Sequence, residues 1–192
     1  MDGSMAMARL TAGGVLEARA AGVALDLPGG WLPAGSLSDR ELSDALGGDA
    51  AAALRVLAGE FGRSDGLALD FSPVLAAVAD QGDATAPVPV RGIVVDVEEP
   101  MASTAARHTA DQIGGVYTRL DVEDAEWAAE IVSPSKWGPD DMGMAMYLVG
   151  YEDRTILAVA TATKDLFDTG LFRSIMRTMR TTGSAVACAA AG

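Results

Sequence analysis

Hydrophobic and polar residues alternate in two neighbouring runs near the C-terminal end of the sequence. The runs extend from Met144 to Tyr151 and from Thr155 to Thr163, and a polar turn of residues 152–154 separates them. Alternation with a period of two predicts a β-hairpin. From about Asp168 to Thr181 apolar side chains recur at helical spacing, which predicts an amphipathic helix that covers the hairpin.

The remaining pattern contains further strands and helices. A hairpin or at least one strand is predicted in residues 15–27, and strands are predicted in residues 88–97, 116–122 and 127–132. Residues 66–78 begin with the alternation of a strand, which does not continue after Pro73. Helices are predicted in residues 38–62, split in two by Gly47-Gly48, and in residues 103–113. Ser103 is a candidate cap for the second helix, and Gly114-Gly115 is expected to end it. Turn-rich loops are expected at 80–89 and 133–143. Because most of the strands follow one another as hairpins, the predicted fold class is α+β, with an antiparallel sheet covered by helices.

These elements predict one folded unit. A chain of 192 residues, 49% of them hydrophobic, is long enough for one well-packed domain, expected at residues 15–182. Residues 1–14 are weakly patterned and residues 183–192 are of low complexity, so both ends are expected to be flexible. Aromatic residues make up only 5% of the chain, so we expect helices and sheet to pack closely through small side chains.

Composition narrows the class of partner. The formal net charge is -13, from 27 acidic and 14 basic residues; it repels phosphate backbones, so nucleic acid is not an expected partner. The first thirty residues contain no basic start followed by a long apolar run, so we expect neither a secretory signal nor membrane insertion. Cys188 is the only cysteine, which excludes a disulfide within one chain and agrees with a cytoplasmic location.

The sequence shows no motif for catalysis or for cofactor binding. His108 is the only histidine, and no further ligand stands at the spacing of a metal site. Nucleophile-elbow and phosphate-binding glycine patterns are also missing. Asp96, Asp121 and Glu130 are among the acidic residues that distant segments could bring together, but no spacing indicates such a site. We therefore expect a protein that is not an enzyme and has neither a cofactor nor a metal.

The C-terminal helix carries the first candidate site for a partner. Arg173, Arg177 and Arg180 recur at steps of four and three residues along one side of the predicted helix. Arginine side chains form paired hydrogen bonds with carboxylates, so this ridge could hold an acidic segment of a partner protein or an anionic ligand. Alternatively, the arginines stabilise the C-terminal end of the helix and pair with neighbouring acidic loops.

Methionines give a second candidate surface. Met144 and Met146 lie in the hairpin, and Met176 lies in the helix predicted to cover it. Flexible thioether side chains form adaptable surfaces for apolar partners, so these three residues are candidate partner-binding residues. The alternative is that they fill the core between the hairpin and the helix.

Four segments resemble the PsbP-like superfamily. They are Gly22-Val-Ala-Leu-Asp-Leu-Pro-Gly-Gly-Trp31, the strand at 127–132, the hairpin at 144–163 and the helix at 171–180. The resemblance implies an antiparallel sheet of about six strands with helices on both faces, and a binding or adaptor role. It supplies no catalytic residues. We expect the chain to differ from the lipoprotein members of the superfamily, because the sequence shows neither a signal pattern nor a lipobox cysteine.

The sequence thus predicts an intracellular bacterial adaptor or chaperone-like protein that binds a protein partner through its sheet face or its C-terminal helix. A small-ligand carrier, with an apolar pocket between sheet and helix, is the alternative. A structural subunit of a larger assembly, such as a homo-oligomer, is a third function that the sequence allows.

Overall fold

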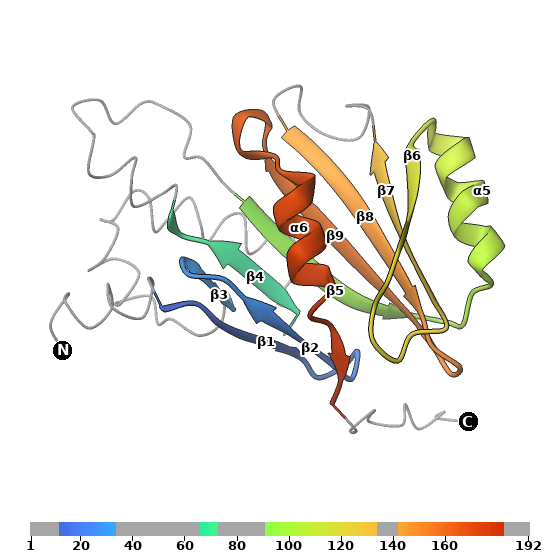
Figure 1. Ribbon diagram of the computed structural model, residues 1–192, viewed down its shortest axis with the longest axis horizontal. Coiled ribbons are helices and arrows are strands. Elements are labelled where there is room, and N and C mark those ends of the chain that lie inside the picture. The colour runs from blue at the N-terminus through green and yellow to red at the C-terminus, as the bar shows by residue number, and fades with distance from the viewer. Residues whose placement is uncertain (1–11, 34–65, 73–90, 134–141, 183–192) are drawn as a thin grey trace, which may run out of the picture.

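The computed structural model describes residues 12–33, 66–72, 91–133 and 142–182 (Figure 1). In chain order the elements are β1 (Gly14–Ala18), β2 (Val23–Leu27), β3 (Trp31–Pro33), β4 (Leu67–Asp70), β5 (Arg91–Glu98), α5 (Ser103–Ile113), β6 (Val116–Leu120), β7 (Trp127–Ser133), β8 (Met142–Gly150), β9 (Thr155–Thr163), the 3-10 turn η2 (Lys164–Leu166), α6 (Thr169–Met176) and β10 (Arg180–Thr181). The predicted helix at 38–62, the predicted loop at 80–89, the predicted tail at 183–192 and most of the predicted flexible N-terminus lie outside these ranges.

The strands pair antiparallel in two sheets. The large sheet has the order β3-β4-β5-β9-β8-β7-β6, and the small sheet has the order β1-β2-β10. The sequence predicted one sheet of about six strands; the described residues instead form a seven-stranded sheet and a three-stranded sheet. With two α-helices in the same ranges, this part of the chain is mainly β.

The predicted C-terminal hairpin is confirmed and lies within the large sheet. β8 and β9 pair along their whole lengths, and β5 pairs with the other edge of β9. β6 and β7, which the sequence also predicted, extend the sheet on the far side of β8. The predicted hairpin at 15–27 is confirmed as β1 and β2, and it belongs to the small sheet.

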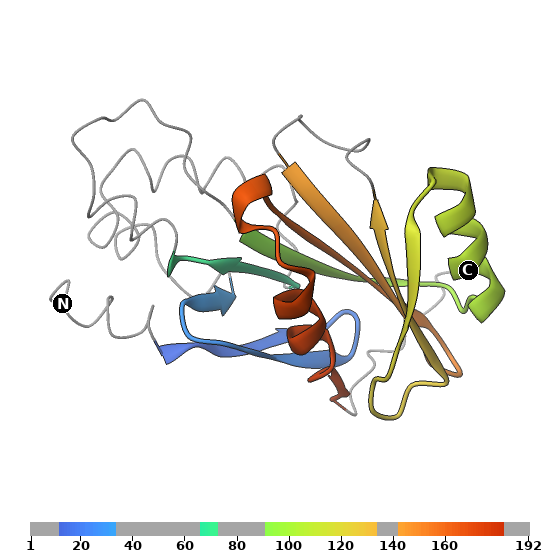
Figure 2. The same ribbon diagram turned by 45° about the horizontal axis from the view of Figure 1, so that its top comes forward.

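The larger core lies between α6, the small sheet and one face of the large sheet. Alternate residues of a strand point to opposite faces, and this face carries Ile93, Tyr147, Ile156 and their neighbours at every second position. α6 contributes Phe172, Ile175 and Met176, and the small sheet contributes Leu16, Val23 and Leu25. Both ribbon views show α6 running beside β8 and β9 on the side of the small sheet (Figure 1, Figure 2).

The smaller core lies between α5 and strands β7 and β8. Its buried side chains are short apart from two: Ala106, Ala110, Ala129, Ile131 and Leu148. In β7, Ala128 belongs to the larger core and Ala129 to the smaller one, as the period of two requires. In the views of Figures 1 and 2, α5 lies at the end of the sheet formed by β6 and β7, away from α6.

The predicted helix at 103–113 is confirmed, but its predicted cap is wrong. Ala102 occupies the N-cap position, and no side chain accepts a hydrogen bond from the first turn. The C-terminal end agrees with the sequence, because Gly114 adopts a left-handed conformation (φ 64°) that glycine takes without steric cost. None of the helices in the described ranges is long and apolar enough to span a membrane.

Candidate functional site

The helix α6 is shorter than the sequence predicted, and this separates the three arginines. Asp168 caps the helix by accepting hydrogen bonds from the backbone N–H groups of Gly170 and Leu171 at 2.8 and 3.3 Å. The helix ends at Met176 with Arg177 as its C-cap, instead of continuing to about residue 181. The predicted ridge of three arginines on one helix is therefore wrong, because Arg180 lies in β10.

The chain leaves the helix because it pairs with the small sheet. Arg180 lies opposite Ala24, and Thr181 lies opposite Val23 of β2. The hydroxyl of Thr178 donates to the backbone oxygen of Ile175 at 2.7 Å and accepts from the backbone N–H of Asp26 at 2.8 Å. This threonine therefore joins the end of α6 to β2, which a helical pattern read along the chain does not reveal.

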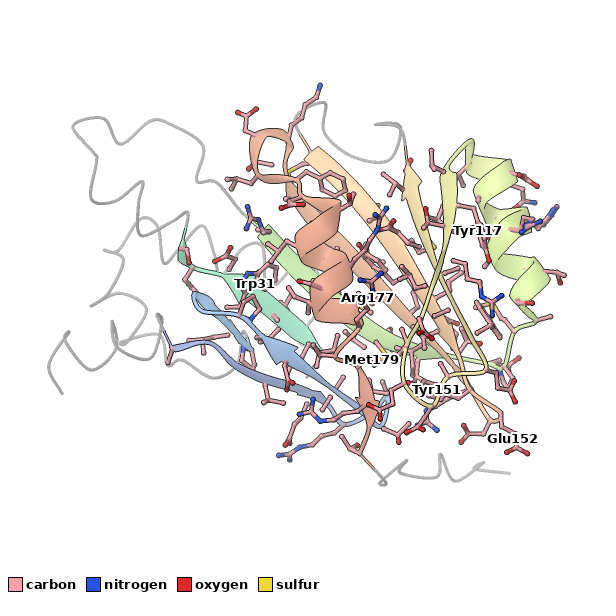
Figure 3. All side chains as sticks on the ribbon, viewed as in Figure 1. Trp31, Tyr117, Tyr151, Glu152, Arg177 and Met179 are labelled. Carbon is pink, nitrogen blue, oxygen red and sulfur yellow. The ribbon has the colours of Figure 1, made fainter. Side chains whose placement is uncertain are left out.

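Each arginine of the predicted site has its own environment. Arg173 pairs with the buried Glu130, and Arg180 pairs with Asp26 at 2.8 Å between two exposed side chains. Arg177 is exposed, and within the described part of the chain its guanidinium has no ion pair and no hydrogen bond. Figure 3 shows Arg177 on the side of α6 that faces β7 and β6, with Trp31 on the opposite side of the helix.

A buried carboxylate fixes α6 to the large sheet. Glu130 lies in β7 and is fully buried, and its Oε1 accepts a hydrogen bond of 2.8 Å from the hydroxyl of Tyr147 in β8. Its Oε2 accepts from Nε of Arg173 at 2.7 Å and from Nη2 of the same residue. Both carboxylate oxygens are thus occupied within the protein, so the group is a structural contact of the helix rather than a free base.

The same contacts shift two proton affinities. Burial raises the pKa of Tyr147 well above its ordinary value, and the negative charge of Glu130 and the hydrogen bond to it raise this pKa further. The hydrogen bond from Arg173 to Glu130 raises the pKa of the guanidinium. Arg173 therefore stays charged and Tyr147 stays neutral over the physiological pH range.

The sequence contained one indication of this contact. Glu130 is a charged residue inside the otherwise apolar run from Trp127 to Val132, and a buried carboxylate needs a charged or hydrogen-bonding partner. The sequence analysis named Glu130 only as one of several scattered acids. Its pairing with Arg173 could not be derived, because it depends on how α6 lies across the sheet.

Asp96, Asp121 and Glu130 do not converge on one place. Asp96 lies in β5, and β9 and β8 separate this strand from β7, which carries Glu130. Both Asp96 and Asp121 are exposed, whereas Glu130 is buried in the larger core face. His108 is exposed on α5, where its Nε2 is 2.9 Å from Nε2 of Gln112. Within the described ranges no three histidine, cysteine or carboxylate side chains could hold a metal ion together.

The methionines do not form one surface between the hairpin and α6. Met176 is fully buried in the larger core, on the side of α6 that faces the sheet. Met144 and Met146 alternate in β8 with Ala145 and Tyr147, which face α6, so the two methionines lie on the other face of the sheet. Met146 packs against the smaller core beneath α5. The prediction that the hairpin methionines lie against the C-terminal helix is therefore wrong. Their role in binding a partner stays a prediction.

Neither a protein-family model nor a curated protein matches this chain. A crystal structure from Bacteroides thetaiotaomicron is similar to it with a TM-score of 0.45 and 8% identity, over 88% of this chain and 48% of the other. The chain thus spans about half the length of that protein. This likeness carries no argument about function, and it does not bear on the resemblance to the PsbP-like superfamily, which stays a prediction.

Proposed function

We propose that the protein is a non-catalytic adaptor or chaperone-like protein of the bacterial cytoplasm, and that it binds an acidic segment of a partner protein on the exposed side of α6. The observation that carries this proposal is the state of Arg177. It is an exposed arginine without an ion pair or hydrogen bond in the described ranges, on a helix whose other arginine is held by Glu130.

The side chains around Arg177 suit the close approach of another chain. Gly170, Ser174 and Arg177 are exposed and follow one another at steps of four and three residues, so they share one side of α6. Glycine and serine leave room beside the helix, and Arg173 is half-exposed one turn before Arg177. A carboxylate of the partner could accept two hydrogen bonds from the Arg177 guanidinium.

The charge of the whole chain makes this position selective. With a net charge of -13, most of the surface repels an acidic partner, whereas Arg177 attracts it locally. Binding of an acidic segment elsewhere on the surface is therefore disfavoured. The proposal accordingly places the contact at α6, and not on the sheet face that the sequence also allowed.

The architecture implied by the PsbP-like resemblance is part of the proposal. α5 packs on the side of β7 that carries Ala129, and α6 packs on the side that carries Ala128 and Glu130. We take this as support for one helix on each face of the large sheet. An arrangement of this kind leaves the outer side of each helix for contacts with other proteins.

Charge reversal at Arg177 tests the proposed function. The immobilised protein is expected to recover a stoichiometric partner from a native lysate of its host, and Arg177→Glu is expected to lose it. Lys164→Glu is the matched control, because it makes the same charge change at another exposed position. Both variants should unfold at the same temperature as the parent protein, since surface substitutions change stability by less than about 0.5 kcal/mol.

Two results would contradict the proposal. One is the absence of any stoichiometric partner on the parent protein, and the other is full recovery of the partner by Arg177→Glu. Arg173→Glu is not a suitable variant, because it would leave the buried Glu130 beside a second carboxylate and would destabilise the fold.

A further inference from the structure

Two arginines flank one aromatic ring on the side of the large sheet where α5 packs. Tyr117 and Arg119 are two positions apart in β6, so their side chains point to the same face, about 7 Å apart at the backbone. The guanidinium of Arg107, on α5, lies over the ring of Tyr117, with its Cζ atom 5.1 Å from the ring centroid. Figure 3 shows Tyr117 between β6 and α5. A helix and a strand thus bring two positive charges beside the same ring.

The polar groups of these three side chains are hydrogen-bond donors without acceptors. Arg107 and Arg119 are exposed, and in the described part of the chain neither guanidinium has an ion pair or a hydrogen bond. The hydroxyl of Tyr117, which is partly buried, also has no hydrogen bond within these ranges. Each guanidinium offers five N–H groups, and the hydroxyl offers one further donor. Two positive charges are therefore uncompensated in a chain with 27 acidic and 14 basic residues.

The ring of Tyr117 holds Arg107 in place without using its N–H groups. Asp111 lies one turn after Arg107 on α5, but an acidic residue that follows a basic one is the weaker order for such a helical pair. The attraction between the guanidinium and the face of the ring directs Arg107 toward β6 instead. A guanidinium that is already positioned loses less freedom when it binds a ligand. Arg107 is thus prepared to donate to an anion beside the ring.

We infer that Arg107, Tyr117 and Arg119 bind one phosphate monoester group. Such a group carries nearly two negative charges at neutral pH and has three terminal oxygens that accept hydrogen bonds, which matches two arginines and a hydroxyl. A carboxylate has one charge and two oxygens, so it would leave one of the two arginines uncompensated. The net charge of -13 repels a chain of phosphates such as nucleic acid, so the ligand is a single group. This site lies on the opposite face of the sheet from the contact proposed at Arg177.

Titration of the full chain with inorganic phosphate, followed by NMR, tests the site. The backbone signals of residues 107, 117 and 119 are expected to shift with phosphate and to stay in place with chloride at the same ionic strength. Arg119→Gln should raise the dissociation constant by about tenfold or more. Tyr117→Phe keeps the ring beneath Arg107 and removes one donor, so it should raise the constant by a smaller factor. Lys164→Gln is the matched control, because it removes one positive charge at another exposed position and should leave the constant unchanged.

Three results would overturn the inference. The first is the absence of any phosphate-dependent shift at residues 107, 117 and 119. The second is an equal dissociation constant for Arg119→Gln and Lys164→Gln, which would mean that phosphate responds only to the total charge. The third is acetate binding at the same residues as tightly as phosphate, which would show a carboxylate site.

A second titration distinguishes the source of the phosphate. The probe is a peptide with blocked termini whose only charged group is one phosphoserine. Binding at least about tenfold tighter than that of inorganic phosphate would assign the group to a phosphorylated partner protein, and equal binding would assign it to a free phosphate or a small ester. In both cases Arg119→Gln must weaken the binding. Peptide binding that Arg119→Gln leaves unchanged would contradict the inference.

Discussion

The two helices dock on the large sheet by different means. α6 buries Phe172, Ile175 and Met176, and it adds the ion pair between Arg173 and Glu130. The fully buried residues of α5 are only Ala106 and Ala110. Large side chains thus fill the contact between α6 and the sheet, whereas the contact of α5 with the sheet is made by small ones.

The two sides also differ in how deeply their aromatic side chains are buried. Trp31, Tyr147 and Phe172 are fully buried in the larger core, whereas Tyr117 and Trp127 are only partly buried beside the smaller core. The two aromatic contacts of Phe172, with Trp31 at 6.2 Å and with Phe167 at 5.7 Å between ring centroids, belong to the α6 side. We therefore expect the α6 side to be sensitive to the removal of atoms and the α5 side to be sensitive to their addition. The ion pair with Glu130 adds a directional constraint to α6. The charged contact of α5 is of another kind, because Arg107 lies over the ring of Tyr117 at 5.1 Å.

Removal of the largest side chain of α6 should have the greatest effect. Phe172→Ala deletes a fully buried ring from the larger core and is expected to lower the free energy of unfolding by about 3–5 kcal/mol. Leu171→Ala, at a half-buried position next to it, should cost clearly less. Urea denaturation followed by circular dichroism measures both. Equal losses would mean that α6 is not anchored through Phe172.

Loss of the charged contact should come next. Arg173→Leu leaves the carboxylate of Glu130 buried without its partner, and we expect a loss of about 3 kcal/mol. Adding Glu130→Gln should restore much of this loss, because glutamine has no charge and keeps an oxygen that can accept the hydrogen bond from Tyr147. If the double variant were no more stable than Arg173→Leu alone, the loss of stability would come from lost packing and not from an unpaired charge.

Addition of atoms on the α5 side should have a moderate effect. Ala110→Leu places a larger side chain where α5 meets β7 and is expected to cost about 1–3 kcal/mol. Asp111→Leu is the control, because it places the same side chain at an exposed position of the same helix, where no neighbour has to move. The unfolding temperatures of the two variants provide the comparison. If Ala110→Leu were as stable as the parent protein, the contact between α5 and β7 would not be closely packed.

The smallest effect should appear at alkaline pH. The pKa of Tyr147 is raised in the folded protein, so above about pH 10 the unfolded chain loses this proton while the folded chain retains it. Stability should then fall with rising pH, by at most about 1.4 kcal/mol per pH unit for this residue. Tyr147→Phe should give a shallower slope between pH 10 and 11 in chemical denaturation. Burial also raises the pKa of Tyr151, so part of the slope should remain. An unchanged slope would contradict the assignment.

The sequence pattern predicted those helices and strands whose formation depends on residues close together in the chain. The hairpin of β8 and β9, the pair of β6 and β7, and α5 with its end at Gly114 all follow from alternation, helical spacing and one glycine. The true end of α6 could not be predicted in this way. The residues after Met176 leave the helix because β2, more than 150 positions earlier in the chain, offers them a strand partner.

The candidate site was predicted only as far as it depends on residues close together in the chain. The helical spacing placed Arg173 and Arg177 one turn apart, and the structure agrees with this spacing. The spacing could not show that Arg173 is paired with Glu130. It also could not show that Met144 and Met146 point away from α6. Which face a strand residue takes depends on the order of strands in the sheet, and this order is a property of the whole fold.

The pairing of β10 with β2 has a consequence for the synthesis of the chain. Val23 and Ala24 pair with β1 on one side and with Thr181 and Arg180 on the other. The small sheet therefore cannot be completed until the ribosome has added residue 181. Until then the hairpin of β1 and β2 has an open edge next to apolar residues that α6 later covers. The nascent chain must therefore carry this unfinished edge from the synthesis of β2 until residue 181 is added, which is the period when a molecular chaperone would protect it best.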